Sequence, residues 1–176
     1  MTMWVFGYGS LLWNPGFPVA DRVLARLPDY HRSFCMRSVH HRGTPEKPGL
    51  VLALDEWPGA ACTGLGLAVA PGAEDETLDY LRERELVSSA YVEKRLWLDL
   101  TDGRRVEAVA YVVDAAHEQY CGDMPLEEQA QTIACALGGR GPNPEYLHNT
   151  VAHLRQLGIE DGDLEWLDER VRVICG

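Results

Sequence analysis

The sequence predicts one α+β domain of 176 residues, spanning 1–176, and three observations predict it. Apolar runs rich in β-branched and aromatic residues alternate with proline- and glycine-containing segments in the first half, which is typical of strands joined by turns. One acidic segment near the middle and the whole last third repeat apolar residues at helical spacing. No internal repeat, low-complexity tract or linker interrupts the chain, whose length suits one sizeable core.

The first expected strand contains Trp4, Val5 and Phe6, whose β-branched and aromatic side chains favour a buried strand. Six further strand candidates follow along the chain: Arg22–Leu27, Tyr30–Val39, Leu50–Asp55, Cys62–Ala70, Tyr91–Leu100 and Arg104–Val113. The last two are separated by Thr101-Asp102-Gly103, which predicts a tight hairpin turn.

Four helices are expected between and after these strands. The segment Ala73–Val87 is acidic in its first turn, which suits the positive end of a helix dipole. A second helix begins at Pro125 and is stopped by Gly138 and its neighbouring glycine. Asn143 is the expected cap of the third helix, and Asp163 opens the fourth. The residues expected on the buried faces of these last three helices are Leu126, Ala130, Ile133, Ala134, Leu137, Leu147, Val151, Leu154, Leu164, Leu167, Val171 and Ile174.

Composition narrows the possible partners. The net charge is −11, from 27 acidic and 16 basic side chains, and the acidic residues are dispersed along the chain. This balance disfavours nucleic acid and anionic membranes as partners. No secretory signal is visible, and no run of 18 apolar residues, the length that predicts a transmembrane helix, occurs.

Cysteine and histidine spacing argues against disulfides and metals. The five cysteines are an odd, irregularly spaced set, so neither a disulfide framework nor a CxxC zinc site fits, and a reducing cytoplasm suits them best. His40 and His41 would point apart on a strand. His148 and His153 are five residues apart and do not share a helix face. No metal site is therefore expected.

The turn Gly7-Tyr8-Gly9-Ser10 follows the first strand directly. Such a turn points backbone N–H groups outward, where they can bind an anion or a developing oxyanion. A hairpin corner is the alternative. Leu12 stands where a dinucleotide fingerprint has its third glycine and where a nucleophile elbow has its last one, so neither motif fits.

Glu85 is a candidate general base. In the predicted helix it falls between Leu78 and Leu81 on the apolar stripe, whereas Glu83 points to the far side. Burial and the negative end of the helix dipole both penalise an ionised carboxylate, so the pKa of Glu85 should be raised, as a base working near neutral pH requires. A structural ion pair with Arg82 is the alternative.

Four segments of the chain, in the same order, resemble the ChaC-like gamma-glutamylcyclotransferases. They are Val5-Phe6-Gly7-Tyr8-Gly9-Ser10-Leu11-Leu12-Trp13, His41–Gly49, Tyr80–Glu85 followed by Tyr91, and Gly139–Leu147 with its Asn-x-Glu-Tyr-Leu element. The resemblance implies a small mixed β-barrel flanked by helices that acts on glutathione, a small-molecule substrate, without a cofactor. The implied products are 5-oxoproline and cysteinylglycine.

The resemblance also implies roles for particular residues. Glu85 takes the catalytic position, and Arg42 is a further candidate for a substrate contact. The residues expected to bind substrate are Val5, Phe6, Gly7, Tyr8, Gly9, Ser10, Leu11, Tyr91 and Tyr146. Leu50 stands where many relatives have an arginine, so other γ-glutamyl peptides or γ-glutamylamines remain alternative substrates. A non-catalytic γ-glutamyl-binding module is a further alternative, and the oligomeric state is left open.

Overall fold

The structure is a computed structural model that describes residues 2–86, 90–122 and 124–176. Within these residues a closed five-stranded barrel and four α-helices confirm the α+β class and the barrel that the resemblance implied. The chain forms two compact units. Unit 1 comprises Met1–Arg32 and Leu54–His117, and unit 2 comprises Ser33–Ala53 and Glu118–Gly176. The expected single-domain organisation stays a prediction.

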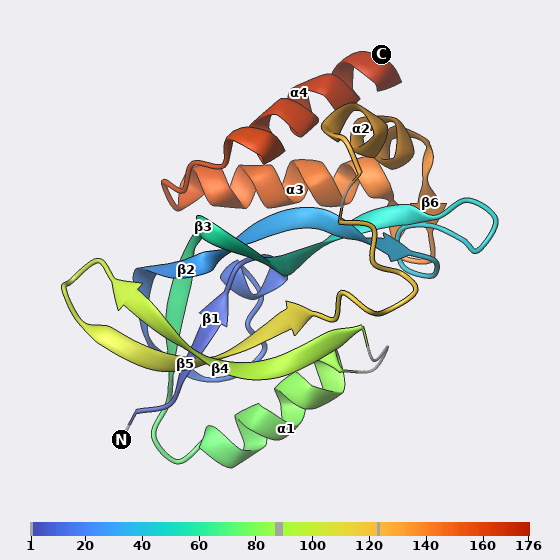
Figure 1. Ribbon diagram of the computed structural model, residues 1–176. Helices are drawn as coiled ribbons and strands as arrows, with labels where there is room; N and C mark the ends of the chain where they lie inside the picture. Colours follow the sequence, from blue (N-terminus) through green and yellow to red (C-terminus); the bar gives the residue numbers. More distant parts are fainter. Residues whose placement is uncertain (1, 87–89, 123) are drawn as a thin grey trace. The chain divides into compact units, whose positions relative to one another are not determined.

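The order of the elements along the chain can be followed in Figure 1. The described residues contain β1 Trp4–Gly7, η1 Ser10–Leu12, β2 Val19–Ser38, β3 Gly49–Val69, α1 Glu74–Glu85, β4 Tyr91–Leu100, β5 Arg105–Val113, α2 Leu126–Cys135, β6 Leu137–Gly138, β7 Gly141–Pro142, α3 Asn143–Gln156 and α4 Gly162–Cys175. The predicted end of the first helix at Val87 lies outside the described residues.

The barrel has the strand order β1-β3-β2-β4-β5 and is closed by pairing of β1 with β5. That closing pair is parallel, with Trp4 opposite Ala108, whereas β1–β3, β2–β4 and β4–β5 are antiparallel. The barrel is therefore mixed, as expected.

The barrel core follows from the two-residue period of its strands. Its buried cluster consists of Trp4, Phe6, Ala25, Leu27, Tyr30, Leu54, Cys62, Ala68, Leu98, Leu100, Ala108, Ala110 and Val112. The alternate residues of β5, among them Val109 and Tyr111, are also buried, although they point away from this core. Figure 1 shows α1 running along β4 and β5, where it covers this outer face.

Strands β2 and β3 are each longer than expected. The sequence predicted breaks at Pro28–Asp29 and at Glu56–Ala61, yet each strand continues through its predicted break. Asp29 and Gly59 adopt positive φ angles of 65° and 87°. The Gly59 N–H donates to the Asp29 carboxylate at 3.0 Å. The two residues of left-handed backbone are therefore joined across the neighbouring strands, which the sequence pattern alone could not indicate.

In unit 2, Asn143 joins α3 to the first part of β3. Its side-chain oxygen accepts the Leu50 N–H at 2.8 Å, and its amide nitrogen donates to the Leu50 carbonyl at 2.9 Å. Asn143 is fully buried and is the first residue of α3, whose N-cap is Pro142. The expectation that Asn143 caps this helix was wrong, because its amide is used by the strand backbone.

The second predicted helix, α2, is shorter than expected. It ends at Cys135, and Leu137, predicted to be buried, is 61% exposed in the short strand β6. A side chain at Gly138 would collide with the backbone of Arg42 and Gly43. The Gly139 N–H also donates to the His40 carbonyl at 2.7 Å. The helix stops because this segment packs backbone to backbone against residues 40–43.

Helix α4 begins with a cap that differs from the expected one. The Asp161 carboxylate, not Asp163, accepts the Leu164 N–H. The apolar face predicted for this helix is confirmed, since Leu164, Leu167 and Val171 are buried.

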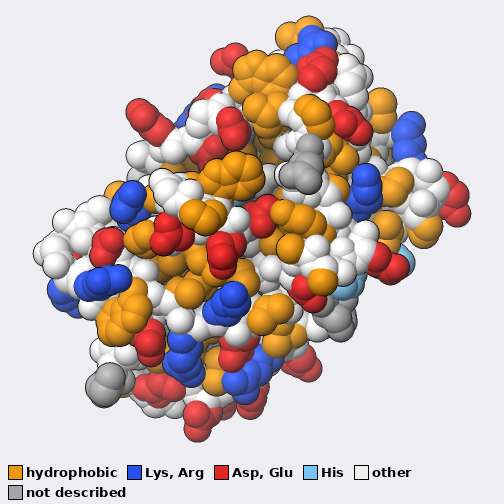
Figure 2. Space-filling view, in the orientation of Figure 1, with side chains coloured by type: hydrophobic (Ala, Val, Ile, Leu, Met, Phe, Trp, Pro, Cys, Tyr) orange, Lys and Arg blue, Asp and Glu red, His pale blue; other side chains and the backbone are white. Residues whose placement is uncertain are grey.

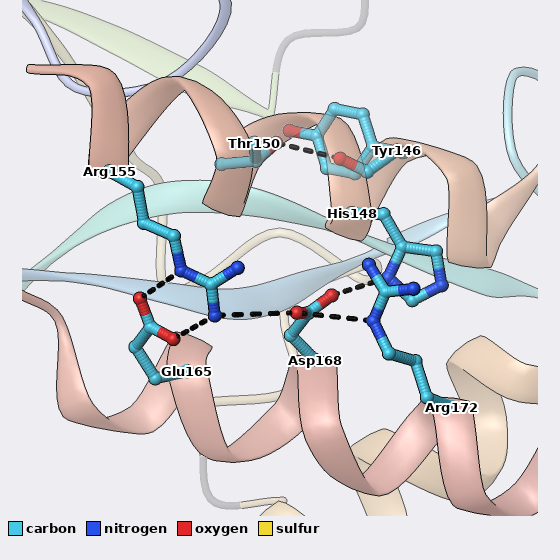
Figure 3. Close-up of polar contacts among 7 residues, drawn as sticks. All are labelled: Tyr146, His148, Thr150, Arg155, Glu165, Asp168 and Arg172. Atoms are coloured by element: carbon cyan, nitrogen blue, oxygen red, sulfur yellow. Dashed lines mark hydrogen bonds and ion pairs between the residues drawn. The ribbon is translucent and has the colours of Figure 1, made fainter.

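A buried carboxylate links α3 to α4. Asp168 of α4 is 2% exposed and contacts His148 and Arg155 of α3, as well as Arg172 one turn later (Figure 3). Arg155 also forms a two-pronged pair with Glu165. Because three cationic or ionisable partners surround Asp168, this buried charge is compensated.

Charged side chains of both signs are interspersed with apolar ones on the face seen in Figure 2. This agrees with the dispersed charge of the sequence. Among the described residues, no helix is long and apolar enough to cross a membrane.

We expect Asn143→Ala to destabilise the protein by about 2–4 kcal/mol, because it removes two hydrogen bonds and leaves a buried backbone N–H and C=O without them. Thermal or urea unfolding measures the change. Asn149→Ala, an exposed substitution in the same helix, is the matched control. Equal stability of the two variants would contradict the structural role of Asn143.

Candidate active site

The glycine turn after β1 leads into the single turn of η1. The Leu12 N–H donates to the Gly9 carbonyl at 2.9 Å, and the Asn14 N–H donates to the Ser10 carbonyl at 2.8 Å. Since β1 pairs with β3 and β5 and not with β2, the turn is not a hairpin corner. A side chain at Gly64 would collide with the Gly7 carbonyl, so glycine lets β3 pass close to the turn.

The side chains of this segment are largely taken up by packing. Val5 and Phe6 are fully buried, Leu11 is buried, and Tyr8 packs against the barrel core. Any contact that Val5, Phe6 or Leu11 makes with a ligand must therefore come mainly from backbone groups. Ser10 is the polar side chain that the turn presents.

Glu85 is the last residue of α1, and its side chain is 18% exposed. Leu81, one turn earlier, is completely buried, whereas Glu83 is exposed, so the predicted inward direction is confirmed. Burial raises the pKa of Glu85 above its usual value, and the positive charge of Arg84 partly opposes this increase. The carboxyl group therefore has the raised proton affinity that was predicted.

Arg84 connects Glu85 to the glycine turn, and the sequence reasoning missed it. Its Nε lies 3.6 Å from Glu85 Oε1, and its Nη2 donates to Ser10 Oγ at 2.8 Å. Nη1 donates to the Asn14 and Pro15 carbonyls at 2.7 and 3.2 Å. One guanidinium thus contacts Glu85, Ser10 and the backbone that follows.

The ring of Tyr80 completes this contact. Arg84 Nη1 donates to the Tyr80 hydroxyl at 3.0 Å. Gly16 has a φ of 76°, and a side chain there would collide with the Tyr80 ring. Glycine at position 16 therefore lets the segment after η1 lie against α1. Periodicity alone could not show that Arg84 lies on the side of α1 that faces the glycine turn.

Arg82 does not pair with Glu85, contrary to the alternative considered from the sequence. Its Nε and Nη2 donate to the two carboxylate oxygens of Glu93 on β4, both at 3.0 Å. Glu93 Oε1 also accepts the hydroxyl of Tyr111, which lies opposite it on β5, at 2.9 Å. These bonds lower the pKa of Glu93, and burial with the Glu93 charge raises the pKa of Tyr111.

The two tyrosines predicted to contact substrate lie in different units. Tyr91 is the first residue of β4 and is half-buried in unit 1. Tyr146 lies in unit 2, where its hydroxyl accepts the Leu52 N–H at 3.3 Å. The guanidinium carbon of Arg42 lies 5.5 Å from the centre of the Tyr146 ring. Unit 1 therefore brings together the glycine turn and Glu85, and unit 2 brings together Tyr146 and Arg42.

Metal ligation finds no support in the described part of the chain, where no cluster of three histidine, cysteine, aspartate or glutamate side chains could hold an ion. Figure 3 shows His148 directed at Asp168, with arginines as the other neighbours. Glu85 likewise has an arginine beside it.

The fold of this chain matches that of a solved enzyme. A yeast enzyme described as a γ-glutamylcyclotransferase specific to glutathione has a crystal structure with a TM-score of 0.87 and 25% sequence identity. The alignment covers 98% of this chain and 96% of the yeast chain. The fold class is therefore confirmed.

The chain belongs to the family of ChaC-like proteins, whose model matches residues 3–174. The glutathione-specific gamma-glutamylcyclotransferase of Escherichia coli (strain K12) is 36% identical over 92% of this chain and 69% of that protein. Gamma-glutamylcyclotransferase 2-1 of Arabidopsis thaliana is 39% identical over 84% of this chain and 71% of that protein. The resemblance predicted from four short segments thus extends over nearly the whole sequence.

We expect Glu85→Gln to stabilise the folded protein at neutral pH. Because the pKa of Glu85 is raised on folding, the folded state binds this proton more tightly than the unfolded state does. Stability is then lost as the pH rises from the unfolded pKa through the folded pKa, by about 1.4 kcal/mol for each unit of difference. Glutamine removes this loss.

Thermal unfolding of the wild-type protein and of Glu85→Gln between pH 4 and pH 7.5 measures the effect. The difference between their melting temperatures should increase with pH. Glu83→Gln is the matched control, because that side chain is exposed on the same helix. A gap that stays constant with pH would contradict a raised pKa for Glu85.

We expect Arg84→Lys to destabilise the protein by about 1–3 kcal/mol, because one ammonium group cannot replace hydrogen bonds to Ser10, the Asn14 carbonyl and Tyr80 together. Hydrogen exchange of the amides in residues 10–16 should accelerate. Arg104→Lys, which alters an exposed arginine on Asp102, is the control. Unchanged exchange in residues 10–16 would show that Arg84 does not hold the turn.

Proposed function

We propose that this protein is a γ-glutamylcyclotransferase that cleaves glutathione to 5-oxoproline and cysteinylglycine. Membership in the ChaC-like family and the named activities of the E. coli and yeast relatives support this reaction. The observation that carries it in this chain is the placement of Glu85. A largely buried carboxyl group with a raised pKa lies beside the glycine turn and is joined to it through Arg84.

The reaction needs no nucleophile from the protein. The α-amine of the γ-glutamyl group attacks its own γ-carbonyl carbon, and the amide bond to the cysteine nitrogen breaks as the five-membered lactam closes. Intramolecular attack has effective molarities on the order of 10⁵ M or more when the reacting groups are held in the right geometry. The main tasks of the protein are therefore to fold the substrate and to move protons.

Glu85 is the group to which we assign proton transfer. The substrate amine must be neutral to attack, and a carboxylate of raised pKa can accept its proton and return it to the departing nitrogen. Burial supplies this basicity. A binding protein without turnover would not need an inward carboxylate, so Glu85 favours an enzyme over a γ-glutamyl-binding module.

The glycine turn is the proposed cradle for the γ-glutamyl group. Backbone N–H groups of Gly9, Ser10 and Leu11 would stabilise the tetrahedral oxyanion, and each such donor typically contributes about 3 kcal/mol. The burial of the Val5, Phe6 and Leu11 side chains fits a role through the backbone. The hydrogen bond from Arg84 to Ser10 keeps the cradle beside Glu85.

Tyr91, Tyr146 and Arg42 remain proposed substrate contacts on the strength of the motif match. The cytoplasmic location predicted from the cysteine pattern, and a small molecule as the sole partner of the site, belong to the same proposal. No cofactor is assigned a step in the reaction.

We expect Glu85→Gln to lower turnover of glutathione by about 10²- to 10⁴-fold while substrate still binds, because glutamine retains the size of glutamate but cannot accept the proton. Release of cysteinylglycine and 5-oxoproline, followed by mass spectrometry, measures it. In the wild-type protein kcat should rise with pH as Glu85 ionises, at a pH above the ordinary glutamate range.

Glu83→Gln is the matched control for this assay and should keep wild-type turnover. Parallel assays with a γ-glutamylamine and another γ-glutamyl peptide separate glutathione cleavage from the wider class of reactions. Wild-type rates in Glu85→Gln would remove Glu85 from the mechanism. A ligand that raises the melting temperature but is unchanged after hours would indicate the binding module instead.

A further inference from the structure

The last turn of α1 reads Arg82-Glu83-Arg84-Glu85, so two arginines lie within three residues before the proposed base. Residues three apart on a helix are close enough to pair, so Arg82 is within reach of Glu85. An opposite charge beside a carboxylate lowers its pKa by about 1–3 units. A direct Arg82–Glu85 pair would therefore cancel much of the effect of burial.

In the structure Arg82 is directed elsewhere. Its guanidinium binds Glu93 with two parallel hydrogen bonds, the geometry that favours arginine–carboxylate pairing. The charge of Arg84 lowers the pKa of Glu85 and so opposes the effect of burial. The two-pronged pair thus separates one of the two nearby cations from the base.

Glu93 is itself held in place. Its Oε1 accepts the hydroxyl of Tyr111, a residue that is 2% exposed on the neighbouring strand β5. The side chain of Glu93 is 20% exposed, whereas that of Arg82 is 48% exposed. Glu93 is therefore the partner that the fold holds in place, and Arg82 is the more exposed side chain that binds to it.

We propose that Glu93, held by Tyr111, is a positioning residue for Glu85: it binds Arg82 and so prevents this cation from pairing with the base. Tyr111 is a second positioning residue, since it acts through Glu93. The role in catalysis rests on the function proposed above for Glu85, but the charge arrangement itself does not.

The other ionisable groups around this turn do not replace that role. From the strands packed against it, Glu93 and Arg95 of β4 and Tyr111 of β5 face the helix, and Arg82 and Arg84 lie on the helix itself. Arg84 is occupied by Ser10, Tyr80 and two carbonyl groups. The charge of Arg95 lowers the pKa of Glu93. Arg82 is thus the cation whose partner can change.

The test is a titration of the Glu85 carboxyl carbon by NMR in protein labelled with carbon-13 at glutamate, assigned by the loss of its signal in Glu85→Gln. Glu93→Gln releases Arg82, and the midpoint of the Glu85 titration should fall by about one pH unit or more. Turnover of glutathione should decrease several-fold with little change in KM, because a less basic Glu85 is a poorer base.

The double variant Arg82→Gln/Glu93→Gln distinguishes positioning from a merely structural role. It removes the released cation, so the Glu85 midpoint and kcat should return toward their wild-type values, which a structural defect would not do. Tyr111→Phe should shift the midpoint in the same direction as Glu93→Gln but by less. The matched control is Glu165→Gln, which breaks the similar Arg155–Glu165 pair and should leave the titration unchanged.

A Glu85 midpoint that does not move in Glu93→Gln overturns the proposal, as does a shift that persists in the double variant. These outcomes are separable from failure of the proposed function. If the wild-type protein releases no 5-oxoproline but the midpoint shifts and recovers as described, the enzyme assignment fails and the role of Glu93 stands. If the wild-type protein releases 5-oxoproline normally but the Glu85 midpoint does not move in Glu93→Gln, the enzyme assignment stands and the role of Glu93 fails.

Discussion

Removal of the Glu85 carboxyl group from water is the main physical constraint on the polar contacts at the end of α1. The carboxyl group lies at the end of α1, where the helix dipole also disfavours a negative charge. Ionising it there costs free energy that the rest of the fold must supply. The site is thus a locally destabilised part of an otherwise well-packed barrel, which is common where proton transfer is needed.

Arg82 and Arg84, the two arginines in the last turn of α1, differ in how they affect the ionisation of Glu85. Arg84 stays close enough to limit the cost of ionisation, and its remaining donors hold the glycine turn. Arg82 is turned to the strand carboxylate of Glu93. Arg84 therefore offsets part of the increase in the pKa of Glu85 that burial causes, whereas the guanidinium of Arg82 is bound to another carboxylate.

Unit 2 relies on backbone contacts that allow little substitution. Asn143 binds both backbone groups of Leu50, and Gly138 lets residues 137–142 lie against the backbone of residues 40–43. Two of the segments that resemble the family, His41–Gly49 and Gly139–Leu147, are therefore in contact within this unit. At least part of their distinctive sequence serves packing, since both polar atoms of the fully buried Asn143 side chain bond to the Leu50 backbone.

The sequence by itself determined the class of fold, the order of most strands and helices, and the inward direction of Glu85. These features depend on local periodicity, which one segment carries alone: β4 lies at Tyr91–Leu100 as predicted, and Leu81 and Glu83 lie on opposite sides of α1. The family resemblance added the barrel. The helix caps at Asn143 and Asp163 and the end of α2 were predicted wrongly, because the contacts that decide them come from distant segments.

Only the tertiary structure decided how the charged groups are paired. From the sequence, Arg82 and Glu85 were as plausible a pair as any, since both lie on one helix within a turn of each other. Arg82 pairs with Glu93, and Arg84 contacts Ser10 and Glu85. These pairings depend on the strand and the turn that the fold brings next to α1. Long side chains can reach several partners, and the fold selects among them by which carboxylates and carbonyls it brings within hydrogen-bonding distance.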